Sequence, residues 1–354
     1  MNLPLDSEIN NVIRTSARRL MDISIAPVRL ALLRDVLVTD AKDKVLQRIE
    51  SECAVYRPKL RLLRGIRNDG TWLVPKKYRE RPLRPHERFQ GWEYTAILKN
   101  LYKLLDYSTI RGEGRVDMVL NKILSWQTEQ GYIPGDWTYA IPIPSRNGCV
   151  LHEVCRFGLA GNPKVERIAE WLLSIQRKDG GWITPYRQDL MYRSKYSDLG
   201  VEEFLDLIVK GGVGDYDPSK FASIPSCHWT TMFVLWGLSE DKRLSDSRAV
   251  KRGAEFLLGR FFQRNPHPGF WPEVSDWTKL DYPPFEGRGM TALDVLTKIG
   301  YGRNDERMSK PIEWLMRARS EDGFWRKWYK PYRESDQWIT LSALRILKRY
   351  LRNQ

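Results

Sequence analysis

Cysteine is scarce in this sequence of 354 residues, and long apolar runs are missing. Only four cysteines occur, which is too few for a disulfide scaffold of this size and indicates a reducing compartment. The longer apolar runs, such as Met232–Leu238, stop far short of the ~20 residues that a membrane-spanning helix needs. Residues 1–20 hold no apolar segment of the kind found in secretory signals. Together these absences predict a cytoplasmic protein.

Positive charge, in contrast, is present in excess. Lysine and arginine number 58 against 44 aspartates and glutamates, which gives a formal net charge of +14. The segment Lys76–Arg88 (KKYRERPLRPHER) and the aromatic segment Trp325–Arg333 (WRKWYKPYR) concentrate this charge. Such an excess favours an acidic partner or ligand and says nothing about the fold. Since 42% of the residues are hydrophobic and 12% are aromatic, a disordered chain is excluded.

A short pattern that ends in glycine and tryptophan recurs along the chain. Trp171–Trp182 (WLLSIQRKDGGW) and Trp314–Trp325 (WLMRARSEDGFW) match in length and ending, and Arg61–Trp72 (RLLRGIRNDGTW) shares both. Ile123–Tyr132 is a shortened version, and Ala254–Trp271 is an extended one. Regular recurrence of this kind is typical of proteins built from structural repeats.

Each unit has the pattern of an amphipathic helix followed by a turn. In one of them Asn162 is a suitable N-cap and Pro163 a suitable first residue. Apolar residues then recur at steps of three and four over Val165–Ile175, which predicts one buried stripe. We expect Asp179-Gly180-Gly181 to end this helix, because glycine accepts the left-handed conformation of a C-cap. Trp182 would then fold back over the helix end.

A second kind of helix alternates with these units and is apolar nearly all round. The five segments are Trp92–Leu105, Cys149–Leu159, Cys227–Leu238, Met290–Ile299 and Trp338–Tyr350. A helix without a polar face is normally buried on two sides. The alternation therefore predicts an all-α fold of two concentric layers, an α/α toroid of about five helix pairs, or an α-solenoid if the ring stays open. We expect one domain over residues 1–354, with residues 1–52 as a helical extension packed on the barrel.

The repeat resembles that of a known superfamily. Its ending Gln176…Gly180-Gly181-Trp182 is similar to the repeat of squalene and oxidosqualene cyclases and of protein prenyltransferase β subunits, which belong to the terpenoid cyclase superfamily. The resemblance covers roughly residues 55–350 and implies a helical barrel with a pocket at the end of the inner helices. The Asp-x-Asp-Asp and Asp-Asp-x-x-Asp motifs of the cyclases are both missing. The fold is therefore carried over, and the cyclase chemistry is not.

Cysteine and histidine at two inner-helix starts suggest a metal site. Cys149, Cys227 and His228 fall at equivalent starting positions, and His152 is a reserve ligand on the first helix. Thiolates and imidazoles are the ligands that zinc prefers. Asn147-Gly148-Cys149 resembles the Asp-x-Cys step of prenyltransferase β subunits, with asparagine in place of aspartate. Cys227-His228 resembles a zinc-binding pair of lanthionine synthetase cyclases. The alternative is that these cysteines are small core residues.

Two functions stay open at this point. The first is a toroid protein with a central pocket for an apolar ligand, such as an isoprenoid with an anionic head. Residues expected at its mouth are Arg79, Arg81, Arg84, Arg88, Trp92, Trp277, Tyr282 and Trp338. The second is a non-catalytic binding module for an acidic partner protein or nucleic acid, although no nucleic-acid motif accompanies its basic and aromatic loops. The sequence does not decide whether the protein is an enzyme.

Overall fold

Helices make up the regular structure of this protein. The computed structural model describes residues 3–135, 137–267, 271–283, 288–329 and 333–353. These residues form sixteen α-helices with short 3-10 and π-helical segments, and their β-structure is limited to isolated bridges. The predicted all-α class is therefore confirmed. Within this part of the chain, no helix has both the length and the apolar character needed to cross a membrane.

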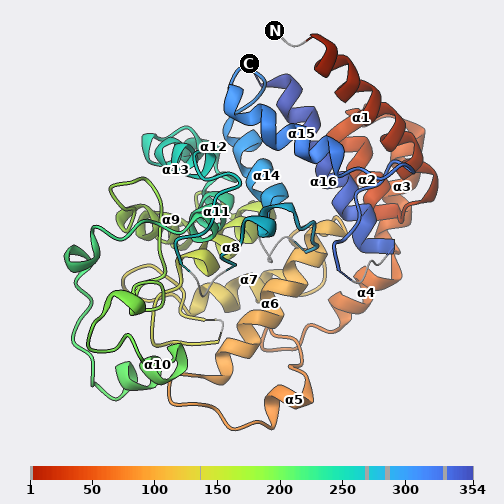
Figure 1. Ribbon diagram of the computed structural model, residues 1–354. Helices are drawn as coiled ribbons and strands as arrows, with labels where there is room; N and C mark the ends of the chain where they lie inside the picture. The colour runs from red at the N-terminus through yellow and green to blue at the C-terminus, as the bar shows by residue number, and fades with distance from the viewer. Residues whose placement is uncertain (1–2, 136, 268–270, 284–287, 330–332, 354) are drawn as a thin grey trace.

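Six helices contact one another in a closed circuit (Figure 1). They are α2 (Ala26–Leu32), α6 (Phe89–Asp106), α8 (Pro144–Val154), α11 (His228–Leu238), α14 (Gly289–Ile299) and α16 (Arg333–Arg352). Helix α6 packs on α8, α8 on α11, α11 on α14, α14 on α16, and α16 on α2, which in turn contacts α6. Five of them are the nearly all-apolar helices expected from the sequence. The sixth, α2, comes from the N-terminal extension.

A second set of helices packs against this circuit. The set comprises α1 (Leu3–Ile23) on α16, α3 (Lys44–Ala54) on α2, α4 (Arg57–Arg64) and α7 (Val116–Ser125) on α6, α9 (Pro163–Ser174) on α8, α13 (Arg248–Leu258) on α11, and α15 (Ser309–Arg317) on α14. Shorter helices α5 (Lys76–Arg79), α10 (Val201–Val209) and α12 (Lys242–Ser245) lie in the connections. The amphipathic reading of α9 is confirmed, because Val165, Ile168 and Leu172 are buried.

Helix α9 begins where the sequence predicts and ends earlier. Asn162 caps its start, since the side-chain oxygen accepts a hydrogen bond of 3.0 Å from the Lys164 amide. The last helical residue is Ser174, so the prediction that Asp179-Gly180-Gly181 ends the helix is wrong. The chain beyond the helix forms a separate tight turn, in which the amide of Arg177 donates to the Gly181 carbonyl and the amide of Gly180 donates to the Arg177 carbonyl.

The tryptophans that close the repeats fold back over their helices, as predicted. Trp72, Trp182 and Trp325 each donate the indole N–H to the carbonyl oxygen of the residue ten positions earlier, at 2.7–2.9 Å. All three side chains are buried. Gly180 permits the turn before Trp182, because its φ of +92° is unfavourable for other residues and a Cβ atom would lie 2.6 Å from the Arg252 carbonyl oxygen. The turn of the extended version, residues 254–271, lies partly outside the described residues.

The glutamine of the repeat joins one unit to the next. Gln176 Nε2 donates to the Gly180 carbonyl at 2.8 Å and to the Ala249 carbonyl on α13 at 2.7 Å. Gln127 makes the equivalent pair of bonds, to its own turn and to the start of α9. Each glutamine thus bridges carbonyl oxygens of two successive units. This explains why glutamine occupies the position in both units.

Candidate functional site

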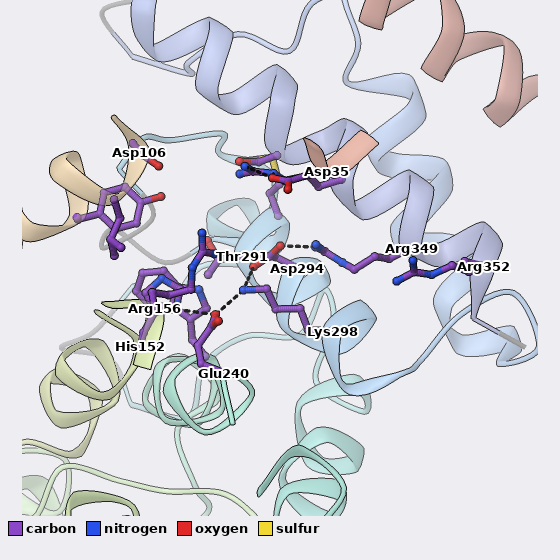
Figure 2. Close-up of a pocket in the computed structure, with 16 residues that line it drawn as sticks. Asp35, Asp106, His152, Arg156, Glu240, Thr291, Asp294, Lys298, Arg349 and Arg352 are labelled. Carbon is purple, nitrogen blue, oxygen red and sulfur yellow. Dashed lines mark hydrogen bonds and ion pairs between the residues drawn. The ribbon is translucent and has the colours of Figure 1, made fainter. Parts of the chain in front are cut away.

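A cavity of about 480 Å³ lies among the helices of the circuit, and its lining is unusually rich in charge (Figure 2). All six circuit helices or their direct continuations contribute side chains to it. The lining includes the charged residues Asp35, Asp106, Arg156, Glu240, Asp294, Lys298, Arg345, Arg349 and Arg352, together with His152. The volume falls in the ordinary range for small-molecule sites. Five side chains of the lining are permanently or normally cationic, and four are carboxylic acids.

These residues come from the carboxyl-terminal parts of their helices. Asp106 is the last residue of α6, Glu240 follows the end of α11, and Lys298 precedes the last residue of α14. Arg156 belongs to the π-helical segment Cys155–Leu159 that continues α8. Because the carboxyl ends of helices carry partial negative charge, their convergence favours the cations of the lining. The backbone thus helps to stabilise positive side chains in a partly enclosed space.

An ion-pair network joins three walls of the cavity. Lys298 Nζ on α14 lies 2.6 Å from Glu240 Oε1 and 3.4 Å from Asp294 Oδ2. Arg349 on α16 also pairs with Asp294, and His152 Nδ1 on α8 lies 2.8 Å from the same Glu240 oxygen. Figure 2 shows these side chains directed toward one another. The network fixes the positions of two carboxylates and three nitrogen-bearing groups inside the cavity.

The charges of this network are set by opposing effects. Burial raises the pKa of Asp294, but Lys298 and Arg349 outweigh it and lower that pKa to about 2. Burial likewise opposes ionisation of Glu240, yet Lys298 and His152 hold its pKa well below the ordinary value. For His152, burial lowers the pKa despite the pull of Glu240 in the other direction. At neutral pH the network therefore holds two ionised carboxylates and a neutral imidazole.

One flank of the cavity is apolar and aromatic. The imidazole of His152 stacks on Trp236 with ring centres 3.7 Å apart and planes inclined by 19°. The centre of the Tyr102 ring lies 6.1 Å from the centre of the Trp236 ring. Leu105 and Met290 are further apolar residues of the lining. The cavity therefore offers flat apolar surface beside its charged groups.

Asp106 differs from the other carboxyl groups of the cavity. Asp35 pairs with Arg345, Glu240 with Lys298 and Asp294 with Arg349. Asp106 forms no ion pair within the described residues. Its Oδ2 atom instead accepts a hydrogen bond of 2.5 Å from the Tyr282 hydroxyl. Burial raises the pKa of Asp106 to about 7, although the bond from Tyr282 acts in the opposite direction.

Two arginines of the lining also lack an ion-pair partner in the part of the chain that the structure describes. They are Arg156, beyond α8, and Arg352, at the end of α16. Both residues are exposed. Arg345 and Arg349, in contrast, are occupied by Asp35 and Asp294. Arg156 and Arg352 are therefore the cations of the cavity with capacity left for a ligand.

Of the residues proposed from the sequence, two are part of this region. Tyr282 bonds to Asp106, and His152, expected only as a reserve metal ligand, lines the cavity. Trp338 stacks behind Tyr282 with ring centres 6.0 Å apart and does not line the cavity. Trp92 stacks on Tyr78 at 4.3 Å. Trp277 is fully buried among aromatic rings.

The four arginines of the segment Lys76–Arg88 lie elsewhere. Arg79, Arg81, Arg84 and Arg88 are not part of the cavity lining. Arg81 pairs with Glu87, Arg84 lies 3.1 Å from Glu202, and the Arg88 guanidinium lies 3.8 Å from the ring centre of Tyr139. The segment also contains the one-turn helix α5. Most of its charge is thus used in contacts within the chain.

The cysteines proposed as zinc ligands occupy unequal helix positions. Helix α8 begins at Pro144, so Cys149 is its sixth residue, whereas Cys227 is the N-cap of α11. The expectation of equivalent helix starts is therefore wrong, because Pro144 starts α8 more than a turn before Cys149. Cys227 Sγ accepts a hydrogen bond of 3.4 Å from Asn265 Nδ2, and Cys149 is buried in the core.

His228 lies beside Trp229 and Trp277, and neither ring nitrogen has a hydrogen-bond partner in the described structure. The described residues contain no group of three or more histidine, cysteine, aspartate or glutamate side chains suited to a metal. The zinc site of Cys149, Cys227 and His228 stays a prediction.

The charged lining was not recognised in the sequence, but a signal for it exists there. Four circuit helices carry two polar side chains four residues apart near their carboxyl ends. The pairs are Tyr102 and Asp106, His152 and Arg156, Asp294 and Lys298, and Arg345 and Arg349. Residues four apart lie on one face of a helix. Recurrence of such a pair in successive, otherwise apolar helices marks the face that points into the cavity.

Comparisons with known proteins assign no family to this chain. No model of a protein family matches the sequence, and no curated protein is similar to it. A crystal structure of a protein from Actinoplanes is similar over 98% of this chain and 99% of its own, with a TM-score of 0.44 and 13% sequence identity.

Proposed function

We propose that this protein binds an amphipathic small molecule with an anionic head in the central cavity. The head, a carboxylate, phosphate or sulfonate-like group, would contact Arg156, and Arg352, which lies across the cavity beyond Arg349 (Figure 2), would add positive charge that attracts it. The apolar part would lie against Tyr102, Trp236 and Met290, which flank the charged region. Flat apolar surface beside a few directed polar groups is the usual composition of a small-molecule site. An isoprenoid with an anionic head is one ligand of this class.

We also propose that the two sets of helices form an α/α toroid. The closed circuit of contacts through α2, α6, α8, α11, α14 and α16 supports an inner ring. The amphipathic helices packed against it would form the outer ring. In this arrangement the cavity is the axial pocket of the toroid, which agrees with the origin of its lining in every inner helix.

The observation that carries the proposed function is the pair of arginines without ion-pair partners among the described residues. Cations in a partly enclosed space repel one another and lose hydration, so an arrangement with spare positive charge favours an incoming anion. With Asp106 protonated, the lining has two more cations than carboxylates. The guanidinium groups can form charge-assisted hydrogen bonds with an oxyanion, which are stronger than neutral ones.

Calorimetric titration with octanesulfonate tests this proposal. We expect wild-type protein to bind octanesulfonate and to bind octanol much more weakly, because octanol lacks the charge. Replacing both arginines, Arg156→Gln with Arg352→Gln, should weaken octanesulfonate binding about tenfold or more, since a hydrogen bond to a charged group contributes about 1.5–3 kcal/mol. Neither substitution breaks an ion pair among the described residues, so the fold should be unaffected.

The matched control is Arg248→Gln, which removes an exposed arginine from the start of α13, outside the cavity lining. It should leave the affinity unchanged. Equal affinity in the double variant and the wild type would contradict the proposed site. Equal binding of octanol and octanesulfonate would contradict the role assigned to charge.

A binding module for nucleic acid is the second candidate, and one observation favours it. Trp328 and Tyr329 are about half exposed, and Lys279 lies 5.0 Å from the Trp328 ring centre. Exposed aromatic rings beside lysines are typical of surfaces on which single-stranded bases stack. Salt-dependent binding of single-stranded DNA that is lost in Trp328→Ala, with no binding of octanesulfonate, would favour this function over the first.

A further inference from the structure

Asp106 occupies a distinctive place in the cavity. Figure 2 shows it on the opposite side from Asp294 and Arg349, at the end of α6. Among the described residues, Asp106 is the carboxyl group of the lining that accepts a hydrogen bond from a tyrosine hydroxyl and forms no ion pair. The ring of Tyr282 is held in place by a parallel stack with Trp338, whose planes differ by 7°. The position of the Asp106 carboxyl is therefore fixed by contacts that do not depend on its charge.

Charged and titratable groups surround this carboxyl from every neighbouring element. They are Tyr102 on α6, Tyr107 directly after α6, Arg156 after α8, Tyr282 before α14, Asp294 on α14, Glu334 and Arg345 on α16, and Asp35 through its pair with Arg345. The positive charges of Arg156 and Arg345 favour the ionised form of Asp106. Burial and Glu334 favour the protonated form, and the balance places the pKa at about 7. Asp106 is consequently poised to change its charge near neutral pH.

We propose that the cavity binds its anionic ligand together with a proton, which is carried by Asp106. This inference rests on the proposed function, because it concerns the ligand of the same cavity. Tyr282 donates to Oδ2, which leaves Oδ1 to carry the proton. A protonated carboxyl can donate this hydrogen to an oxygen atom of the ligand, whereas an ionised one repels the anion. The ligand class is accordingly an oxyanion, and binding and protonation strengthen each other reciprocally.

The dependence on pH has a definite direction. Below pH 7, Asp106 already carries its proton in most of the free protein. Binding is therefore tight there, and few protons are taken up from the solution. Above pH 7, the free protein must first protonate Asp106, so affinity falls as pH rises. His152 does not produce this effect, because its pKa is lowered and it is already neutral. Asp294 and Glu240 do not either, because their pKa values are held low.

Octanesulfonate is the appropriate probe, because its own charge is constant over this range. Between pH 6 and pH 8 we expect its dissociation constant for the wild-type protein to rise about three- to tenfold, since one unit of pKa corresponds to a tenfold change in an equilibrium. Calorimetry at pH 7 in buffers with different ionisation enthalpies should show net proton uptake on binding. Asp106→Asn should bind with constant affinity across the range and without proton uptake.

Two further variants separate this role from a structural one. Glu170→Gln removes an exposed carboxyl on α9, outside the cavity lining, and should keep the wild-type dependence on pH. Tyr282→Phe removes a bond that favours the ionised carboxylate, so the fall in affinity should move to higher pH. The Tyr282 result does not depend on Asp106→Asn being folded.

The possible failures are distinguishable. If octanesulfonate does not bind at any pH, the proposed function itself is wrong. If it binds with an affinity that is independent of pH, or if Asp106→Asn retains the proton uptake of the wild type, the proposed function stands and the role of Asp106 is overturned.

Discussion

Replacing Trp182 by alanine should lower the free energy of unfolding by about 3–5 kcal/mol, as expected for a buried tryptophan that leaves a cavity. The side chain is fully buried, and its indole N–H donates to the Leu172 carbonyl at 2.7 Å. Its loss therefore removes apolar packing and leaves a carbonyl oxygen of α9 without its donor. Urea unfolding followed by circular dichroism measures the effect.

Trp325→Ala should give a loss of the same size, because Trp325 occupies the equivalent place over α15. Trp182→Phe should lie between alanine and the wild type, since it keeps most of the volume and loses the hydrogen bond. Trp328→Ala is the matched control: this tryptophan is 49% exposed, so its loss should change stability by less than about 1 kcal/mol. Similar stabilities for Trp182→Ala and Trp328→Ala would contradict the role given to the repeat.

Replacing Lys298 by methionine should have the second large effect. Methionine keeps much of the length of the side chain but leaves Glu240 and Asp294 without their shared cation. Removal of one partner from a buried ion pair costs about 3–5 kcal/mol, and we expect the lower end because the side chain is 18% exposed. Thermal melting at pH 7 should show a clear decrease.

The effect of Lys298→Met should depend on pH. In the wild type, both carboxyl groups have folded-state pKa values below their ordinary ones. They therefore contribute stability above the unfolded-state pKa, near 4, and this contribution is lost as pH falls through the folded-state values. Without Lys298 their pKa values rise, so they are protonated at pH 4.5 and the deficit relative to wild type should shrink there.

The exposed Lys348 on α16, the helix that carries Arg349, provides the control. Lys348→Met should melt close to the wild-type temperature at both pH values. A deficit for Lys298→Met that is equal at pH 4.5 and pH 7 would mean that its cause is packing and not charge.

The sequence predicts the helices well because their signals are local. The repeated glycine–tryptophan ending, the Asn162 cap and the apolar stripe of α9 each depend on a few neighbouring residues. Helix boundaries are less well predicted. Pro144 begins α8 before Cys149, and α9 ends at Ser174, since the turn around Gly180 is a structure in its own right.

The site was missed because its geometry depends on contacts between distant parts of the chain. Arg345 pairs with Asp35, 310 positions away, and Tyr282 bonds to Asp106 across 176 positions. No local pattern places these partners together. The aromatic and basic residues chosen from composition, such as Trp277 and Arg81, prove to pack or pair within the chain. The recurrent polar pairs of the circuit helices were the informative signal.

The most direct test of the account is a crystal structure with 4-bromobenzenesulfonate, whose bromine and sulfur atoms can be located separately by anomalous scattering. We predict one molecule in the cavity, with its sulfonate near Arg156 and its bromine toward Tyr102 and Trp236. If the crystals show the compound bound to arginines on the outer surface while the cavity stays empty, the proposal that this cavity is the functional site is contradicted.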